Sequence, residues 1–287
     1  MDRRDFLKGF LATGCVLASG AEAGAAAAQG GTRRDGAVRF LVFNDIHERP
    51  KLPLEIARHV KRDMDFTVMN GDLIEDIRDE ESVRKFILAP MKDIADLYGV
   101  PCHFVRGNHE WRGVDKEKLG GYMAFEAADF YRAFTLRGVR FVFLDTFEDA
   151  KGKYEPFIER VAKENEWLRR EVASDAWRNA VKRIVVMHIP PPVEPQVGKR
   201  IRWTCTSPGL REMDDILNAS GVSFLCGAHL HRRRIQDVCD FRSYPMFVGG
   251  GPEHKSDVGT EVTVSADGIG VRQIDKKGVV VESAYFA

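Results

Sequence analysis

From Val38 to the C-terminus, short apolar segments rich in β-branched and aromatic residues alternate with longer segments whose apolar residues recur every three to four positions. The short segments predict strands and the longer segments predict amphipathic helices. The predicted strands are 38–43, 66–69, 102–105, 139–144, 183–187, 222–226 and 244–248. The predicted helices are 54–63, 80–97, 119–130, 156–173 and 209–218. This alternation is typical of a layered α/β domain.

The last part of the chain has a different pattern. Three further strands are predicted, at 261–265, 270–274 and 279–283, and Ala-Asp-Gly and Lys-Lys-Gly turns separate them. Short turns of this kind predict an antiparallel meander. Prolines modify the pattern in two places. Pro90 should kink or divide the helix over 80–97, and the proline-rich segment 190–208 predicts a long loop.

Composition places the chain among ordinary globular proteins. Its 287 residues are 44% hydrophobic and 30% charged, which fits one large core and a single domain over residues 31–287. Basic and acidic residues both number 43, so the formal net charge is zero. The chain therefore lacks a bulk charge that would attract nucleic acid or an anionic membrane, and any recognition of phosphate must be local.

Residues 1–30 differ in kind from the rest. Arg3 and Arg4 are followed by Phe6-Leu7-Lys8, a weakly apolar run over 9–18 and an Ala/Gly-rich stretch ending near Gln29. The run is shorter than the ~20 apolar residues of a membrane span, so the layout predicts an export signal. It resembles bacterial twin-arginine signal peptides, although Asp2 replaces the usual Ser or Thr. The resemblance implies the twin-arginine export machinery as a partner and a periplasmic or secreted protein.

The five cysteines add one alternative. Cys15 follows Leu-Ala-Thr-Gly, which faintly resembles a lipoprotein acylation site, so a membrane-tethered form of the same domain remains an alternative. Cys102, Cys205, Cys226 and Cys239 lack the C-x-x-C spacing of a zinc knuckle. We expect these four to be small buried apolar residues.

The residues that directly follow five predicted strands are of the types that bind metals. They are Asp45 and His47 after 38–43, Asp72 after 66–69, Asn108 and His109 after 102–105, His188 after 183–187, and His229 and His231 after 222–226. Strand ends at one edge of a sheet lie close together in α/β folds, so these side chains can converge. Side chains two positions apart lie on the same side of an extended chain, so Asp45 with His47, and His229 with His231, can each reach one site.

The donor set indicates the kind of metal. Imidazole, carboxylate and one amide oxygen, without thiolate, suit a divalent Mn, Fe, Zn, Ni or Co ion. These side chains are more than one ion takes from protein, and two ions that share a carboxylate fit the count. Gly71, Gly107 and Gly227 precede the ligands at points where the backbone is expected to turn sharply.

Together the motifs resemble the calcineurin-like metallophosphoesterase superfamily. Its ordered pattern D-x-H, G-D, G-N-H-[DE], H and G-H-x-H is matched by Asp45-Ile46-His47, Gly71-Asp72, Gly107-Asn108-His109-Glu110, His188 and Gly227-Ala228-His229-Leu230-His231. The resemblance covers about residues 38–252. The last motif departs from the pattern because Ala228 separates Gly227 from His229. Either the strand end accommodates one more residue, or the glycine has shifted while the two histidines keep their places; we favour the second, because the two histidines alone are the ligands.

The resemblance implies a fold, a site and a reaction. The fold is a four-layer sandwich, two packed β-sheets flanked by helices. One metal is held by Asp45, His47, Asp72 and His231, and the other by Asp72, Asn108, His188 and His229, with Asp72 bridging. His109 stabilises the phosphoryl group or protonates the leaving oxygen, while Asn108 neutralises developing charge. A hydroxide bridging the two metal ions attacks a phosphomonoester or phosphodiester.

Several residues near the motifs keep two interpretations. The carboxylates Glu75 and Asp76 either orient ligands or are solvated, and Asp145 and His254 either line the site or lie away from it. A substrate-contacting role and a structural role are both open for Trp111, Arg112, Arg202 and Trp203. The basic cluster either supplies positive potential to the site or forms a solvated turn; it consists of Arg232, Arg233 and Arg234. His59 and His103 are expected to be ordinary structural residues. A catalytically silent metal-binding or phosphate-binding module is the alternative function, and it predicts loss of a ligand or of His109. Every such position is filled.

Overall fold

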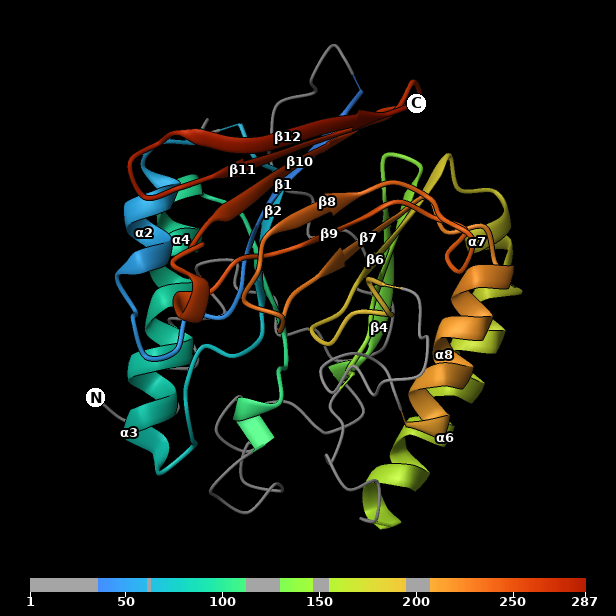
Figure 1. The fold of residues 1–287 in the computed structure, drawn as a ribbon, viewed down its shortest axis with the longest axis horizontal. Coiled ribbons are helices and arrows are strands. Elements are labelled where there is room, and N and C mark those ends of the chain that lie inside the picture. The colour runs from blue at the N-terminus through green and yellow to red at the C-terminus, as the bar shows by residue number, and fades with distance from the viewer. Residues whose placement is uncertain (1–35, 61–62, 112–129, 147–154, 195–206) are drawn as a thin grey trace.

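The computed structural model describes residues 36–60, 63–111, 130–146, 155–194 and 207–287. Within these residues, two six-stranded sheets face each other (Figure 1). The first has the order β12-β11-β10-β1-β2-β3, with β1 Val38–Phe43, β2 Phe66–Asn70, β3 Cys102–Val105, β10 Gly259–Val264, β11 Ile269–Ile274 and β12 Val280–Phe286. The second has the order β4-β5-β6-β7-β9-β8, with β4 Arg132–Leu136, β5 Val139–Phe143, β6 Lys182–Val186, β7 Phe224–Gly227, β8 Arg234–Gln236 and β9 Met246–Val248.

Both sheets are mixed, and each contains a set of neighbouring parallel strands. Strands β1, β2 and β3 are parallel neighbours, as are β5, β6, β7 and β9. The predicted meander is confirmed, since β10, β11 and β12 pair antiparallel and β10 joins β1. The parallel strands therefore bring their carboxyl ends to one edge of the sandwich, where ligands of α/β folds bind.

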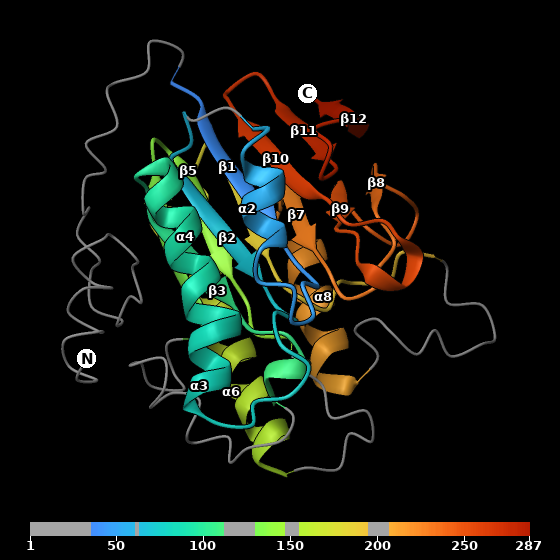
Figure 2. The ribbon, with the colours of Figure 1, turned by 90° about the vertical axis from the view of Figure 1, so that its left-hand side faces the viewer.

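Helices cover the outer face of each sheet. On the first sheet lie α2 Leu52–Ala57, α3 Glu80–Val83, the π-helical turn η1 Arg84–Leu88 and α4 Ala89–Tyr98, and on the second lie α6 Glu155–Val172, α7 Asp175–Arg178 and α8 Pro208–Ala219. Figure 2 shows α2 and α4 lying over β1 and β2. Between the sheets, apolar side chains such as Phe40, Phe141 and Phe247 form a buried layer. This arrangement confirms the four-layer sandwich.

Three predictions of local structure need correction or refinement. The helix predicted over 54–63 starts at Leu52, with Pro53 in its first turn, and ends at Ala57. The helix over 80–97 is divided just before Pro90: the Ala89 N–H bonds to Arg84 O, a π-helical step, because proline offers no N–H to the normal ladder. Strands β4 and β8 were not predicted, because edge strands carry mixed, half-exposed residues. The four-residue helix α7 was not predicted either.

Some predictions lie outside the described residues. These are the export signal over 1–30 with Cys15, most of the helix over 119–130, most of the loop over 190–208, Cys205, Arg112, Arg202 and Trp203. Among the described cysteines, Cys102 and Cys226 are buried as expected, whereas Cys239 is exposed, which corrects that expectation.

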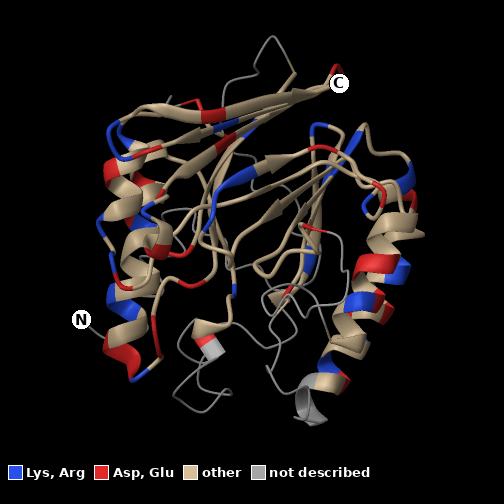
Figure 3. Cartoon of the chain, in the orientation of Figure 1, with Lys and Arg blue, Asp and Glu red and all other residues tan. Residues whose placement is uncertain are grey.

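Charged residues are concentrated on the outer helices and in turns (Figure 3). Basic and acidic residues alternate there, as on α6 and α8, and the strands between the helices are mostly uncharged. Within the described residues, no helix is both long and apolar enough to cross a lipid bilayer.

Candidate metal centre

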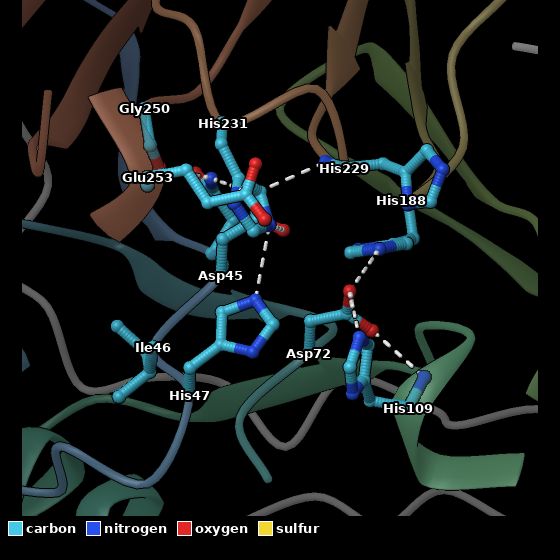
Figure 4. A network of polar contacts seen from close by, with 12 residues as sticks. Asp45, Ile46, His47, Asp72, His109, His188, His229, His231, Gly250 and Glu253 are labelled. Atoms are coloured by element: carbon cyan, nitrogen blue, oxygen red, sulfur yellow. Dashed lines mark hydrogen bonds and ion pairs between the residues drawn. The ribbon is translucent and has the colours of Figure 1, made fainter. Parts of the chain in front are cut away.

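The predicted ligands meet at the carboxyl ends of the parallel strands. Figure 4 shows Asp45, His47, Asp72 and His109 from the first sheet facing His188, His229 and His231 from the second. Each lies two or four residues beyond the end of its strand, so the ligands follow the strands as the sequence indicated. The two sheets therefore contribute separate parts of one site.

The turns that carry these residues have an uncommon backbone conformation. Left-handed φ values occur at Asp45 (50°), His47 (46°), Asp72 (53°), His229 (70°) and His231 (54°). Residues other than glycine rarely adopt this backbone conformation, and where they do, the surrounding structure must stabilise it. Hydrogen bonds between the turns provide this support: the Asp45 N–H donates to Gly71 O (3.0 Å) and the His47 N–H donates to Asp72 O (2.9 Å).

The three glycines have two different roles. Gly71 has a φ of +77°, and a Cβ there would lie 2.4 Å from His188 Nδ1. A Cβ at Gly107 would lie 2.3 Å from Asp72 Oδ1, and one at Gly227 would lie 2.8 Å from Pro190. Only Gly71 therefore makes a left-handed turn as predicted, whereas Gly107 and Gly227 permit close approach.

The inserted Ala228 does not displace the final histidine pair. Gly227 is the last residue of β7, and the buried Ala228 donates its N–H to His188 O (2.9 Å). The turn is made by His229 and His231 themselves, which have the left-handed φ values. His231 lies in a group of candidate ligands with Asp45, and His229 lies in another with Asp72, so both histidines reach the site despite the inserted residue.

Three groups of the described side chains have the spacing needed to hold a metal ion: two of them share Asp72, and the third consists of His47, Glu75 and His109. The first contains Asp45, His47, Asp72 and His231, and the ligand atoms of its members all lie within 4.8 Å of one another. Asp45 Oδ1 lies 3.3 Å from His231 Nε2, and His47 Nε2 lies 3.0 Å from the same nitrogen.

The second group contains Asp72, His188 and His229, again within 4.8 Å. Asp72 Oδ2 lies 3.2 Å from His188 Nε2. Asp72 therefore belongs to both groups. Asn108 lies in the turn between Gly107 and His109, and its buried Oδ1 accepts no hydrogen bond from the described residues.

Buried polar atoms at this centre fit a cation. Asp45 Oδ1, Asp72 Oδ2 and His188 Nε2 face other polar atoms but make no hydrogen bond of good geometry within the described parts of the chain. Buried polar atoms are nearly always satisfied in folded proteins, so these closely spaced polar atoms need an explanation. Carboxylate, imidazole and amide donors around one point are a suitable ligand set for divalent metal ions.

The charge states of the histidines are tuned by burial and by Asp72. Burial opposes charge on Asp72, but the attraction and close polar contact with His188, together with the attraction to His109 and His229, hold the pKa of Asp72 well below its usual range. Burial also opposes charge on His188, yet the contacts with Asp72, Asp45 and the Asn70 backbone oxygen together raise the pKa of His188 to about 10. Burial lowers the pKa of His229 to about 4, and His188 adds to this effect. Burial similarly lowers the pKa of His47. His47 and His229 are thus already neutral, the form that binds metal, whereas a cation must displace the proton on His188.

A buried carboxylate joins the turns after β2 and β3. Glu110 accepts the backbone N–H groups of Asp72 (3.0 Å), Leu73 (2.8 Å) and Gly107 (2.7 Å). Burial, together with the charge of Asp72, raises the pKa of Glu110 to about 7. Sequence reasoning included Glu110 in a motif but gave it no role. Its contacts show that it fixes the two turns relative to each other.

A second carboxylate orients two histidines. Glu75 Oε1 lies 2.8 Å from His47 Nδ1, and its Oε2 lies 3.2 Å from His109 Nδ1. His109 Nδ1 also lies 2.9 Å from the Glu75 backbone oxygen. These contacts direct the Nε2 atoms of both rings toward the centre, and His109 Nε2 lies 3.9 Å from Asp72 Oδ2. Of the two interpretations of Glu75, the orienting one is supported, while Asp76 is exposed.

The remaining candidates lie outside the two groups. Asp145 is fully buried and forms ion pairs with Arg106 and Arg160. His254 is exposed and accepts a hydrogen bond from Arg232 Nε (3.0 Å), and Arg234 pairs with Glu194. His103 packs among phenylalanine rings, as expected of a structural residue, and His59 is exposed just beyond α2.

The family model for calcineurin-like phosphoesterases matches residues 38–233, which span β1 to the turn after His231. The chain belongs to this family. The match contains every residue of both groups, and family membership identifies the protein as a phosphoester hydrolase. Among curated proteins, none matches the chain.

Solved structures share the fold of this phosphoesterase. A purple acid phosphatase from yellow lupin (Lupinus luteus) seeds is 14% identical, with a TM-score of 0.62 over 87% of this chain and 53% of that one. A dimetal phosphatase from Danio rerio is 13% identical, with a TM-score of 0.61 over 87% and 98%. PhoD is 11% identical, with a TM-score of 0.57 over 87% and 68%. The phosphoesterase thus spans about half of the lupin enzyme, and these similarities establish the fold.

Proposed function

We propose that this phosphoesterase hydrolyses phosphomonoesters or phosphodiesters with two divalent metal ions. The observation that carries the proposal is the position of Asp72, which belongs to two separate groups of candidate ligands. One ion would be held by Asp45, His47, Asp72 and His231, and the other by Asp72, Asn108, His188 and His229. When bound, a pair of such ions supplies Lewis acidity toward the phosphoryl group and activates water as a nucleophile.

The residues of the chain supply binding and proton transfer. His109 donates Nδ1–H to the Glu75 backbone oxygen, which directs Nε2 toward the centre; in the imidazolium form, the second proton, on Nε2, can pass to the leaving oxygen and leave the neutral ring. The side chain of Asn108 adds an amide dipole near the transferred phosphoryl group. Glu75 contacts Nδ1 of His47 and Nδ1 of His109 and so keeps both rings in the orientations that these roles require.

Metal-dependent activity tests this proposal. The chain is stripped with a chelator, reloaded with Mn²⁺, and assayed on bis-p-nitrophenyl phosphate and on the monoester p-nitrophenyl phosphate. We expect reloading to restore hydrolysis, and His109→Ala to lower kcat by about 10²- to 10⁴-fold while keeping its metal. If the wild type binds two ions yet hydrolyses neither ester, the silent binding module becomes the better description.

We also propose export, on the basis of the sequence of residues 1–30. Replacing Arg3 and Arg4 with lysines should abolish accumulation of the protein in the periplasm of a bacterial host. The alternative lipoprotein form predicts that Cys15→Ala moves the protein from the membrane fraction to the soluble one. Unchanged fractionation of that variant would remove the alternative.

A further inference from the structure

Two buried asparagines connect the sheets beside the candidate metal centre. Asn44 directly follows β1, and Asn70 is the last residue of β2; they are 3% and 0% exposed. Asn44 Nδ2 donates to Gly250 O (2.9 Å), just beyond β9, and Asn70 Nδ2 donates to Met187 O (2.9 Å), just beyond β6. Because the carbonyl partners can only accept, the amide nitrogens must face them. Each asparagine therefore ties the first sheet to the second.

Such ties matter because each candidate ion takes ligands from both sheets. The layer between the sheets consists of apolar side chains, whose packing is non-directional. A metal site needs its ligands positioned to within about 0.5 Å. Directional hydrogen bonds at the strand ends can supply that precision.

Asn44 acts on the half of the site that contains Asp45 and His231. Its Nδ2 also donates to Asp45 Oδ2 (2.6 Å), which accepts the His229 N–H as well (3.0 Å). Asp45 Oδ1 is thereby directed toward His231. The Gly250 segment lies against the same histidine: a Cβ at Gly251 would lie 2.8 Å from the His231 ring.

Asn70 acts on the half that contains Asp72 and His188. Its side chain bonds to the residue before His188, and its backbone oxygen lies 2.8 Å from His188 Nδ1. Asp72 follows two residues later, with Oδ2 3.2 Å from His188 Nε2. Asn70 thus fixes both the position and the orientation of His188 relative to Asp72.

We infer that Asn44 and Asn70 are positioning residues that each control the metal affinity of one half of the site. Asn44 controls the ion held by Asp45, His47, Asp72 and His231, and Asn70 controls the ion held by Asp72, Asn108, His188 and His229. The inference rests on the proposed dinuclear function. Loss of a residue that orients metal ligands typically weakens metal binding by about 10- to 100-fold, and here the loss is confined to one of two ions.

Gln273 provides a matched control. It is a fully buried amide on β11, and its Nε2 donates across the sheets to Val248 O (3.0 Å), the last residue of β9. It has the same chemistry and also joins the sheets, but among the described residues its side chain bonds to no candidate ligand and to no residue adjacent to one. Gln273→Ala therefore reports the loss of a buried cross-sheet hydrogen bond by itself.

The experiment is a Mn²⁺ titration of the stripped full-length chain, followed by metal analysis and electron paramagnetic resonance. We expect Asn44→Ala and Asn70→Ala each to keep one ion at near wild-type affinity and to bind the other about 10- to 100-fold more weakly. The Mn²⁺ resonance of Asn44→Ala should resemble that of His231→Ala, in which a ligand of the same ion is lost. The Mn²⁺ resonance of Asn70→Ala should likewise resemble that of His188→Ala. Gln273→Ala should bind both ions as the wild type does.

Three results would overturn the inference. These are wild-type affinity for both ions in the asparagine variants, an equal loss in Gln273→Ala, or an exchange of the two resonance patterns. If Asn44→Ala does not fold, the isosteric Asn44→Asp, which removes the donors and keeps the volume, is titrated in its place with the same expectation. A wild type that binds fewer than two ions contradicts the dinuclear proposal, and the inference with it, whereas two ions bound at wild-type affinity in both asparagine variants contradict the inference alone.

Discussion

Glu110 offers the most direct test of how the turns of the site are held. Its Oε2 accepts the N–H groups of Asp72 and Gly107, and its Oε1 accepts that of Leu73. In Glu110→Gln, the amide oxygen can replace Oε2 and keep two of these bonds, but the new NH₂ group faces the Leu73 N–H. One buried donor is left unsatisfied, which costs about 1–3 kcal/mol. Glu110→Ala removes all three acceptor contacts and should cost roughly 3 kcal/mol or more.

The assay is urea unfolding of the metal-free chain, because the absence of metal separates turn stability from ligand binding. Glu80→Ala is the control: Glu80 is half-exposed and pairs with Arg84 at the i,i+4 position, so its loss should change the free energy of unfolding by about 0.5 kcal/mol or less. If Glu110→Ala is as stable as Glu80→Ala, the three N–H contacts do not hold the turns and the reasoning is refuted.

Three further predictions concern other residues. Glu75→Gln should weaken Mn²⁺ binding by about 10-fold or more and lower kcat, because the amide is a weaker acceptor for His47 and His109; unchanged titration and turnover would exclude an orienting role. Gly71→Ala should lower the melting temperature and the metal content together, since its Cβ meets the ring of His188 in a left-handed turn; a fully loaded, equally stable variant would contradict this. Burial raises the pKa of Glu164 to about 8 from an ordinary value of 4.5, so the folded state binds this proton more tightly than the unfolded state does. The stabilisation is therefore present at low pH and is lost as pH rises from about 5 to 8, by at most about 5 kcal/mol at about 1.4 kcal/mol per pKa unit. Glu164→Gln should flatten the profile of unfolding free energy against pH.

The sequence was most informative where strands end. Apolar runs followed at once by Asp, His or Asn residues located every member of the two ligand groups, because the parallel strands bring those ends to one edge. Strands β4 and β8 were not predicted, because they lie at sheet edges and include half-buried polar residues such as Arg132 and Arg234, which interrupt the run of apolar residues that marks a buried strand.

The supporting contacts could not be predicted from the sequence. Glu110 bonds to N–H groups 37 and 38 residues away, and Asn44 reaches a carbonyl 206 residues away. Nothing local in the sequence marks such partners, since any buried acceptor meets whatever donor the fold brings to it. The one available signal was position: Asn44 and Asn70 both stand at strand ends, one and two residues before Asp45 and Asp72.

The shared position of Asp72 is the central claim, and metal stoichiometry tests it most directly. Metal analysis of the reloaded wild type should give two ions per chain, His109→Ala should keep both, and Asp72→Ala should lose affinity for both at once, because this carboxylate belongs to both ligand groups. An Asp72→Ala variant that still binds one ion at wild-type affinity would show that the carboxylate is not shared and would contradict the account.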